Sequence, residues 1–235
     1  MTHLIKAQDV SKRFGPRQVL QRLYLEILKG EVVALIGPNG AGKTTTLSIL
    51  LGMQKADEGA ISYWRPDYRA HVGVQLQTTP FFEGYTAQEN LQFFAALYGQ
   101  KPPRERLDRL LNACGLWQAR HTPAVRLSLG QQKRLAIAVT TLHEPDLIIL
   151  DEPTAGLDPL ARRDIRDMIL SLRAKGITVL LTSHDLSEVR KVADRLLFLH
   201  RGKIAAEGSP TGLMAAYNAA DLDDLYLKIT QSEAE

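Results

Sequence analysis

Hydrophobic residues near the start of the chain follow two successive patterns. Over residues 23–27, apolar and polar side chains alternate, a period of two that is typical of a strand with one buried face. After a turn at residues 29–30, the run Val32–Ile36 is apolar throughout, as expected for a strand buried on both faces. The change predicts an antiparallel sheet with one exposed face, joined to a central, mainly parallel sheet.

Two later apolar runs fit the same central sheet. Residues 147–150 and 177–181 predict buried strands. Between them, the spacing of Ile165, Ile169 and Leu172 predicts an amphipathic helix. Strands that alternate with helices indicate an α/β fold with parallel strands.

A segment of different periodicity interrupts this core between about residues 84 and 142. Apolar residues recur at helical spacing over 107–114. Thr86, followed three positions later by Glu89, matches a capping box and predicts a helix start. We therefore expect an inserted α-helical subdomain, with Cys114 as a core residue rather than a reactive thiol.

The last part of the chain predicts two small elements. Residues 196–199 and 203–206, separated by a turn at 201–202, have the pattern of a hairpin. Residues 221–229 predict a short terminal helix. The length of 235 residues fits one large α/β domain better than two independent cores.

Composition narrows the class of protein. Hydrophobic residues make up 45% and charged residues 23%, close to the average for globular domains. No apolar run approaches the roughly 18 residues needed to span a bilayer, and the start has no apolar stretch of a signal peptide. One cysteine and six scattered histidines argue against disulfides and structural zinc. A net charge of +3 suits an anionic ligand or lipid headgroups and decides neither.

The segment after the first buried strand has the spacing of a phosphate-binding loop, G-x-x-x-x-G-K-[ST]. The loop and the helix start consist of Gly37, Pro38, Asn39, Gly40, Ala41, Gly42, Lys43, Thr44 and Thr45. Glycines let backbone N–H groups turn toward a polyphosphate at a helix N-terminus. Lys43 adds a positive charge, and the Thr44 hydroxyl suits Mg²⁺. The alternative, an accidental glycine-rich turn, fits poorly because both the preceding strand and the following helix are predicted.

Two acids follow the predicted strand at 147–150. Asp151 and Glu152 should lie at the carboxyl edge of the sheet, where ligands bind in α/β folds. Asp151 is suited to hold Mg²⁺, and Glu152 to accept a proton from a water molecule that attacks a phosphate. Alone, the pair could be a polar strand end before Pro153. The phosphate loop favours the metal site.

Residues 127–131, Leu-Ser-Leu-Gly-Gln, resemble the L-S-G-G-Q signature of the ATPase subunits of ABC transporters. Other positions match that family in the same order. Phe14 resembles the aromatic residue that stacks on adenine, and Gln77 the glutamine that links the metal to the helical insertion. Asp158 lies in a segment similar to the D-loop of the family, and His184 resembles its switch histidine. The resemblance extends from about residue 4 to residue 229.

This resemblance implies an ATP-binding domain over residues 1–212, followed by a short helical tail at 213–235. It also implies that ATP and Mg²⁺ are the cofactors, with Thr44, Gln77 and Asp151 on the metal side. By the same resemblance, Glu152 is the general base and His184 orients the attacking water. The resemblance assigns the remaining nucleotide contacts, including those to ATP bound by a second nucleotide-binding domain, to Phe14, Ser128, Gly130, Gln131 and Asp158.

Two of these residues have plainer alternatives. His184 alone could be an ordinary polar residue at a strand end, and Phe14 alone could be a core aromatic residue. One position departs from the family, because Leu129 replaces the first glycine of the signature pair. Since the serine and the second glycine are kept, we expect this site to bind phosphate.

The resemblance also predicts partners. These are transmembrane permease subunits and a second nucleotide-binding domain, either identical or a close homologue, which would place the chain in the cytoplasm at the inner face of the cell membrane. Phe81, Phe82 and Tyr85 form an expected permease seat, or alternatively pack within the helical insertion. The ending at 221–228 resembles motors paired with exporter-type permeases, which favours export over import.

Two other functions would use the same ATP-binding residues. One is an ABC-type ATPase that acts on nucleic acid or ribosomes. Such chains usually carry coiled coils or two ATPase domains, which are not evident here, so we expect no nucleic-acid partner. The other is a regulatory subunit that holds ATP without hydrolysing it, and Glu152 with His184 argues against it. The transported substrate is not encoded in these motifs.

Overall fold

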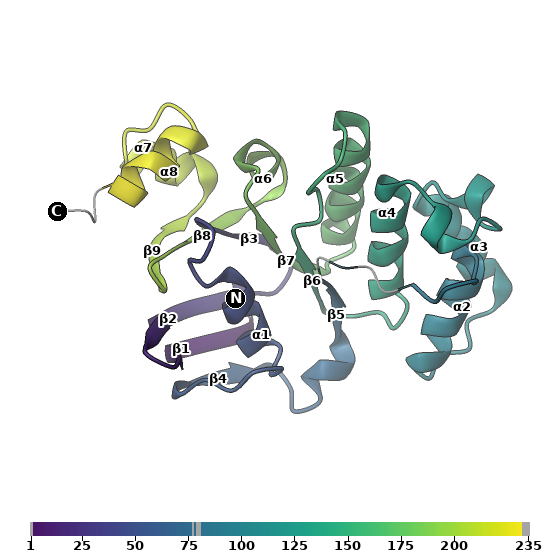
Figure 1. The fold of residues 1–235 in the computed structure, drawn as a ribbon, viewed down its shortest axis with the longest axis horizontal. Helices are drawn as coiled ribbons and strands as arrows, with labels where there is room; N and C mark the ends of the chain where they lie inside the picture. Colours follow the sequence, from purple (N-terminus) through teal and green to yellow (C-terminus); the bar gives the residue numbers. More distant parts are fainter. Residues whose placement is uncertain (1, 77, 79–80, 232–235) are drawn as a thin grey trace.

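The computed structural model describes residues 2–76, 78 and 81–231, and Figure 1 shows its fold. A six-stranded sheet has the order β5-β6-β7-β3-β8-β9. Its strands are β3 (Val32–Ile36), β5 (Val72–Gln75), β6 (Leu147–Asp151), β7 (Thr178–Ser183), β8 (Arg195–His200) and β9 (Lys203–Gly208). All neighbours are parallel except β8 and β9. The mainly parallel central sheet predicted from the apolar runs is confirmed.

A second sheet is antiparallel and has three strands in the order β2-β1-β4. They are β1 (His3–Phe14), β2 (Arg17–Leu28) and β4 (Glu58–Tyr63). In β2, Leu23, Leu25 and Ile27 are buried while Tyr24 is 49% exposed. The alternating pattern therefore marks a strand with one buried face, as predicted.

Helices cover both sheets and form the insertion. The α-helices are α1 (Lys43–Leu50), α2 (Ala87–Leu97), α3 (Arg104–Ala113), α4 (Leu129–Thr140), α5 (Pro159–Ala174), α6 (Leu186–Val192), α7 (Pro210–Ala216) and α8 (Leu222–Gln231). Short 3-10 helices are η1 (Tyr68–His71), η2 (Trp117–Ala119) and η3 (Ala124–Arg126). Among the described helices, none has the length and apolar character of a membrane span. In Figure 1, α2 and α3 lie at the end of the molecule opposite α7 and α8.

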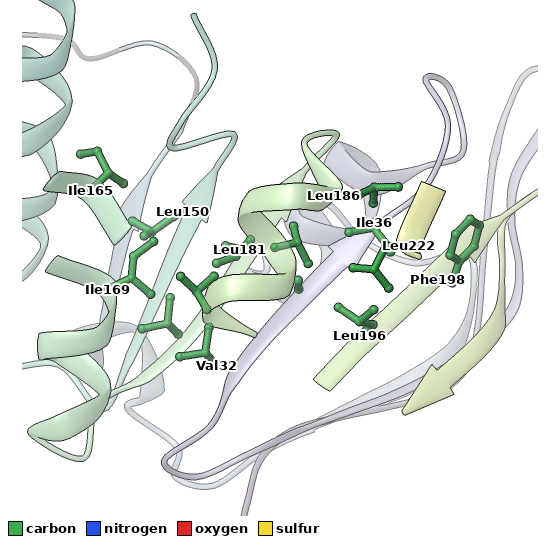
Figure 2. Packing of buried hydrophobic residues seen from close by; sticks show 14 of the residues in the cluster. Val32, Ile36, Leu150, Ile165, Ile169, Leu181, Leu186, Leu196, Phe198 and Leu222 are labelled. Atoms are coloured by element: carbon green, nitrogen blue, oxygen red, sulfur yellow. The ribbon is translucent and has the colours of Figure 1, made fainter. Parts of the chain in front are cut away.

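Successive residues of the central strands contribute to two different cores. In β3, Val32 and Ile36 pack with residues of α5, α6 and α8 on one face of the sheet (Figure 2). Val33 and Leu35 pack on the other face, with α1 and the antiparallel sheet. Since alternate side chains of a strand point to opposite faces, only a continuous apolar run can serve both cores.

The helical insertion has a core of its own. Helix α2 begins with the predicted capping box: Glu89 N donates to the Thr86 hydroxyl at 3.2 Å, and Thr86 N donates to the Glu89 carboxylate at 2.8 Å. Cys114 lies in this core with Leu107 and Leu111. Burial raises the pKa of the Cys114 thiol to about 12, which fits the predicted structural role.

The C-terminal elements pack onto the central sheet. The predicted hairpin is formed by β8 and β9, and the predicted terminal helix is α8. Leu222, Leu225 and Ile229 of α8 belong to the same core as Val32 and Ile36. The predicted division between residues 212 and 213 falls inside α7, and as a boundary of domains it stays a prediction.

Candidate functional site

The predicted phosphate loop connects β3 to α1, with glycines where the chain has no room for side chains. A Cβ atom on Gly37 would collide with the carbonyl oxygen of Leu199. Gly40 and Gly42 have φ angles of 79° and 109°, which residues with a Cβ rarely adopt. The loop therefore requires these glycines to keep its backbone turned at the start of α1.

The start of α1 fits a phosphate ligand. Gly42 caps the helix and offers no side chain to accept a hydrogen bond from its first turn. The Lys43 ammonium donates to the carbonyl oxygens of Gly37 at 2.7 Å and Pro38 at 3.3 Å. Burial lowers the pKa of Lys43, opposed by the charges of Glu152 and Asp151. The loop thus combines backbone N–H groups, a helix N-terminus and a nearby cation.

Asp151 and Glu152 lie at the carboxyl end of β6, as predicted, and are 5% and 9% exposed. Glu152 has a φ angle of 52°, a strained value for a residue with a side chain. Thr182 in the neighbouring β7 contacts both acids. Its hydroxyl donates to Asp151 Oδ1 at 2.5 Å and accepts from Glu152 N at 3.0 Å.

His184 follows β7 and lies directly beside the predicted base. Its Nδ1 is 2.6 Å from Glu152 Oε2, and its side chain is 66% exposed. The structure thus brings together two residues that are 32 positions apart in the numbering. This contact with Glu152 distinguishes His184 from an isolated polar residue at a strand end.

Lys133 of α4 also reaches these acids, and sequence reasoning missed it. The residue is 5% exposed, and its Nζ lies 3.5 Å from the carbonyl oxygen of Glu152. Burial lowers the pKa of Lys133, while the charges of Asp151 and Glu152 oppose that shift. Its position one turn before Ile137, on the buried side of the helix, was the available signal.

Two adjoining hollows collect most of the predicted residues. One has a volume of about 660 Å³ and includes Lys133 and His184, with Asp223 and Tyr226 contributed by α8. The other has a volume of about 410 Å³. Together they are lined by the predicted residues Phe14, Gly37, Pro38, Asn39, Gly40, Gly42, Lys43, Thr44, Thr45, Asp151, Glu152 and His184. Phe14 is 48% exposed, which excludes the core alternative.

The predicted metal ligands fit a cation that is shared with a phosphate group. Thr44 and Asp151 both line the smaller hollow, and hard oxygen donors suit Mg²⁺. Within the described ranges, no group of three or more histidine, cysteine or acidic residues could hold a metal alone. Gln77, the third predicted ligand, lies outside the described residues.

The signature and D-loop residues begin helices. Ser128 caps α4, accepting from Gln131 N at 3.3 Å and donating from its own N to the Gln131 side chain at 3.0 Å. Asp158 caps α5 by accepting from the N–H groups of residues 160 and 161. A Cβ atom on Gly130 would lie 2.8 Å from Ala161 Cβ, so these helix ends pack closely. Ser128, Gly130, Gln131 and Asp158 line neither hollow.

The predicted permease seat is an exposed cluster of aromatic rings beside an apolar groove. The ring centroid of Phe82 lies 4.2 Å from that of Phe93, 5.5 Å from Phe94 and 6.2 Å from Tyr85. Phe82 is 36% exposed and Tyr85 43%. Phe81 packs against the core of the insertion and lines a groove of about 430 Å³. The aromatic residues therefore both pack within the insertion and face outward.

Comparison with known proteins shows which family this chain matches. Residues 20–155 match the family model described as ABC transporter. A lantibiotic transport ATP-binding protein of Streptococcus pyogenes is 37% identical, with 87% of this chain and 90% of the relative covered. A fluoroquinolones export ATP-binding protein of Mycobacterium tuberculosis is 35% identical, over 92% of this chain and 74% of the relative.

Solved structures agree in fold. The ATP-binding subunit of an ABC transporter superposes with a TM-score of 0.85 at 32% identity, covering 96% of this chain and 99% of that one. An ATP-binding cassette in its ADP conformation gives a TM-score of 0.82 at 28% identity, with coverage of 97% and 99%. A dimeric post-hydrolysis cassette bound to ADP and Pi gives 0.77 at 27% identity, with coverage of 88% and 98%.

Proposed function

This chain belongs to the ABC transporter family as an ATP-binding, ATP-hydrolysing subunit, and from that premise we propose that it drives export through separate permease subunits. The observation that carries the catalytic part is the contact of Glu152 with His184 at 2.6 Å, beside the phosphate loop. Export is supported by relatives whose names specify lantibiotic transport and fluoroquinolones export. The transported molecule would be selected by the permease.

In the proposed site, the chain holds ATP by three kinds of contact. The loop amides and Lys43 bind the phosphates, and the exposed ring of Phe14 stacks on adenine. Thr44 and Asp151 would hold Mg²⁺, together with Gln77. When bound, Mg²⁺ neutralises charge on the phosphate oxygens. Thr182 keeps the Asp151 carboxylate in place through its hydroxyl.

Hydrolysis is assigned to the two residues in contact. Glu152 accepts the proton of the attacking water, and His184 orients that water and the carboxylate. The left-handed backbone of Glu152 supports this role, because strained conformations cluster at functional sites. Both residues line the larger hollow with Pro38 and Asn39 of the phosphate loop.

A second copy of the cassette, or a close homologue, completes each site in this proposal. Ser128, Gly130 and Gln131 lie outside the hollows of their own chain, yet they form a helix N-terminus suited to an anion. We assign them to the γ-phosphate of ATP bound by the partner, and Asp158 to the contact between the two sites. Similarity to a dimeric cassette bound to ADP and Pi supports this arrangement.

The permease is assigned to the aromatic cluster of Phe82, Tyr85, Phe93 and Phe94 and to the groove beside it. Apolar surface of this kind is typical of protein interfaces. A docked permease segment would cover Phe82 and Tyr85, which are 36% and 43% exposed. This docking would hold the chain at the inner face of the membrane.

Substitution of the two neighbouring acids tests the proposal. Glu152→Gln keeps the shape of the side chain but removes the proton acceptor, so we expect turnover to fall about 10²- to 10⁴-fold while ATP affinity is retained. Unhydrolysed ATP should then hold the chain as a dimer, visible by light scattering. Asp151→Asn should instead weaken Mg²⁺-dependent ATP binding as well as turnover. Turnover within a few-fold of wild type for Glu152→Gln would show that the base is misassigned.

A further inference from the structure

Lys133 is a buried cation in the wall of the catalytic hollow. Its side chain comes from α4 in the helical insertion, whereas Asp151 and Glu152 come from the central sheet. The residue is 5% exposed, and its Nζ lies 3.5 Å from the carbonyl oxygen of Glu152. A buried ammonium loses its hydration, and an apolar residue is usually the less costly occupant of such a position. Packing alone therefore does not explain why a charged residue occupies this position.

The surrounding charges show what the ammonium faces. Two lysines, Lys43 from the phosphate loop and Lys133 from α4, interact electrostatically with the same two carboxylates, Asp151 and Glu152. Burial lowers the pKa of Lys133, and the two carboxylates counteract this shift. Both lysines line the hollows that contain Glu152. The insertion thus contributes one positive charge beside the acidic pair, and the phosphate loop contributes another.

Contacts on both sides of Glu152 hold its backbone. Its N–H group donates to the Thr182 hydroxyl at 3.0 Å, and its carbonyl oxygen faces the Lys133 ammonium. Between these two contacts the residue has a φ angle of 52°, which the chain adopts only where its surroundings enforce it. Displacement of Lys133 would therefore release one side of the peptide that aims the carboxylate.

The same helix begins at the signature. Ser128 caps α4, and Lys133 lies on that helix about one and a half turns further along. Because a helix of this length moves as a rigid element, a shift at its first turn is transmitted to the Lys133 side chain. Ser128 faces the nucleotide of the partner in the proposed dimer, while Lys133 faces the base of its own chain.

We propose that Lys133 is a positioning residue that couples two events. One is the binding of the signature residues at 127–131 to ATP held by the partner, and the other is the placement of Glu152 in the active site of the chain that carries Lys133. This inference rests on the proposed function, since it requires Ser128 to bind ATP of a second cassette and Glu152 to act as the base. The competing explanation is that Lys133 only fastens the insertion to the sheet.

Steady-state kinetics of the purified full chain test the first half of this inference. Lys133→Gln should lower kcat about tenfold or more. The KM for ATP should change less than about twofold, because the phosphate loop is untouched. For comparison, loss of a group that touches the transition state directly costs about 10²- to 10³-fold in kcat. Lys133→Arg, which keeps the charge, should recover most of the loss. Lys101→Gln removes an exposed lysine of the same insertion and should match wild type in both parameters.

Thermal unfolding and a double substitution complete the test. A residue that only fastens the insertion would lower the unfolding midpoint and would leave kcat of the folded enzyme unchanged, and this result would overturn the inference. If coupling is present, Ser128→Ala combined with Lys133→Gln should lose less kcat than the product of the single losses. Multiplicative losses would overturn the coupling.

Glu152→Gln, measured in parallel, separates this inference from the proposed function. If Glu152→Gln stays active, the proposed function fails. If Glu152→Gln is inactive while Lys133→Gln is fully active, only the inference about Lys133 is refuted.

Discussion

At the scale of single residues, the Thr182 hydroxyl shows how the sheet orients two acids with different proposed roles. It donates to the Asp151 carboxylate and accepts from the backbone N–H of Glu152. Thr182 is fully buried, so water cannot replace either contact easily. One side chain in β7 therefore fixes the end of β6 where the proposed metal ligand and base lie side by side.

We expect Thr182→Val to impair turnover more than stability. Valine has nearly the same shape but leaves the N–H of Glu152 without an acceptor, which should cost about 1–3 kcal/mol of unfolding free energy. Turnover should fall about tenfold or more, since a misplacement of reacting groups by about 1 Å can cost about 10²-fold. Denaturant unfolding and ATPase assays measure the two effects.

Thr178→Val is the matched control for that substitution. Thr178 lies in the same strand, is equally buried, and its hydroxyl accepts from Gly30 N at 2.9 Å. It should lose similar stability and keep its turnover. Equal losses of turnover in both variants would show that Thr182 acts only through the stability of β7.

Which site residues could be predicted depended on whether they belong to a local pattern. Asp151 and Glu152 come at the end of an apolar strand, and Lys43 belongs to the loop motif that follows another apolar strand, so their place at the sheet edge follows from the sequence. Thr182 and Lys133 are different, because each reaches the acids from another element. The helical spacing of Lys133 indicates only that it is buried, and the contact of either residue with the acids depends on the pairing of β6 with β7 and on the packing of α4.

At the scale of elements, α2 and α4 begin with the same arrangement. In each, the backbone N–H of the third helical residue donates to the cap hydroxyl, and the backbone N–H of the cap donates to the side chain of the third residue, as in Thr86 with Glu89 and Ser128 with Gln131. Both boxes satisfy N–H groups that a helix start leaves without partners. Of these two capping boxes, only the one at Ser128 is also proposed to bind a ligand, the ATP held by the partner.

This duplication allows the two roles of Ser128 to be separated. Ser128→Ala and Thr86→Ala should each cost about 1 kcal/mol of unfolding free energy through the lost cap. Ser128→Ala should also weaken ATP-dependent dimerisation, whereas Thr86→Ala should not. Light scattering with ATP and Mg²⁺, in a Glu152→Gln background, measures this difference. Equal dimerisation of both variants would limit Ser128 to capping.

Elements were predictable where periodicity is strong, and their arrangement was less so. Alternation identified β2, continuous apolar runs identified β3 and β6, and helical spacing identified α3. Boundaries shifted slightly: β7 begins at Thr178 rather than at residue 177, and α1 begins at Lys43, inside the phosphate loop. The order of the strands could not be derived, because periodicity shows which face is buried but not which strand is the neighbour.

At the scale of the whole molecule, the exposed aromatic cluster is the expected contact with the permease. We predict that Phe82→Asp prevents copurification with the permease and abolishes transport, because a carboxylate without a counter-charge is costly in an apolar interface. Nucleotide affinity should be unchanged. Leu97→Asp is the control, since Leu97 is 63% exposed on the same α2 helix and does not line the groove. Normal assembly and transport by Phe82→Asp would place the seat elsewhere.

The position of β3 in the sheet also bears on how the chain is made. Val32 pairs with Val179 of β7, and Val33 pairs with Arg195 of β8, so the strand that precedes the phosphate loop has both neighbours near the end of the chain. Ribosomes release the N-terminal part first, so this strand cannot pair with both neighbours until β7 and β8 have been translated. A nascent chain that stalls before β8 lacks the Leu199 backbone against which Gly37 packs, so we expect ATP binding to appear only after β8 has been translated.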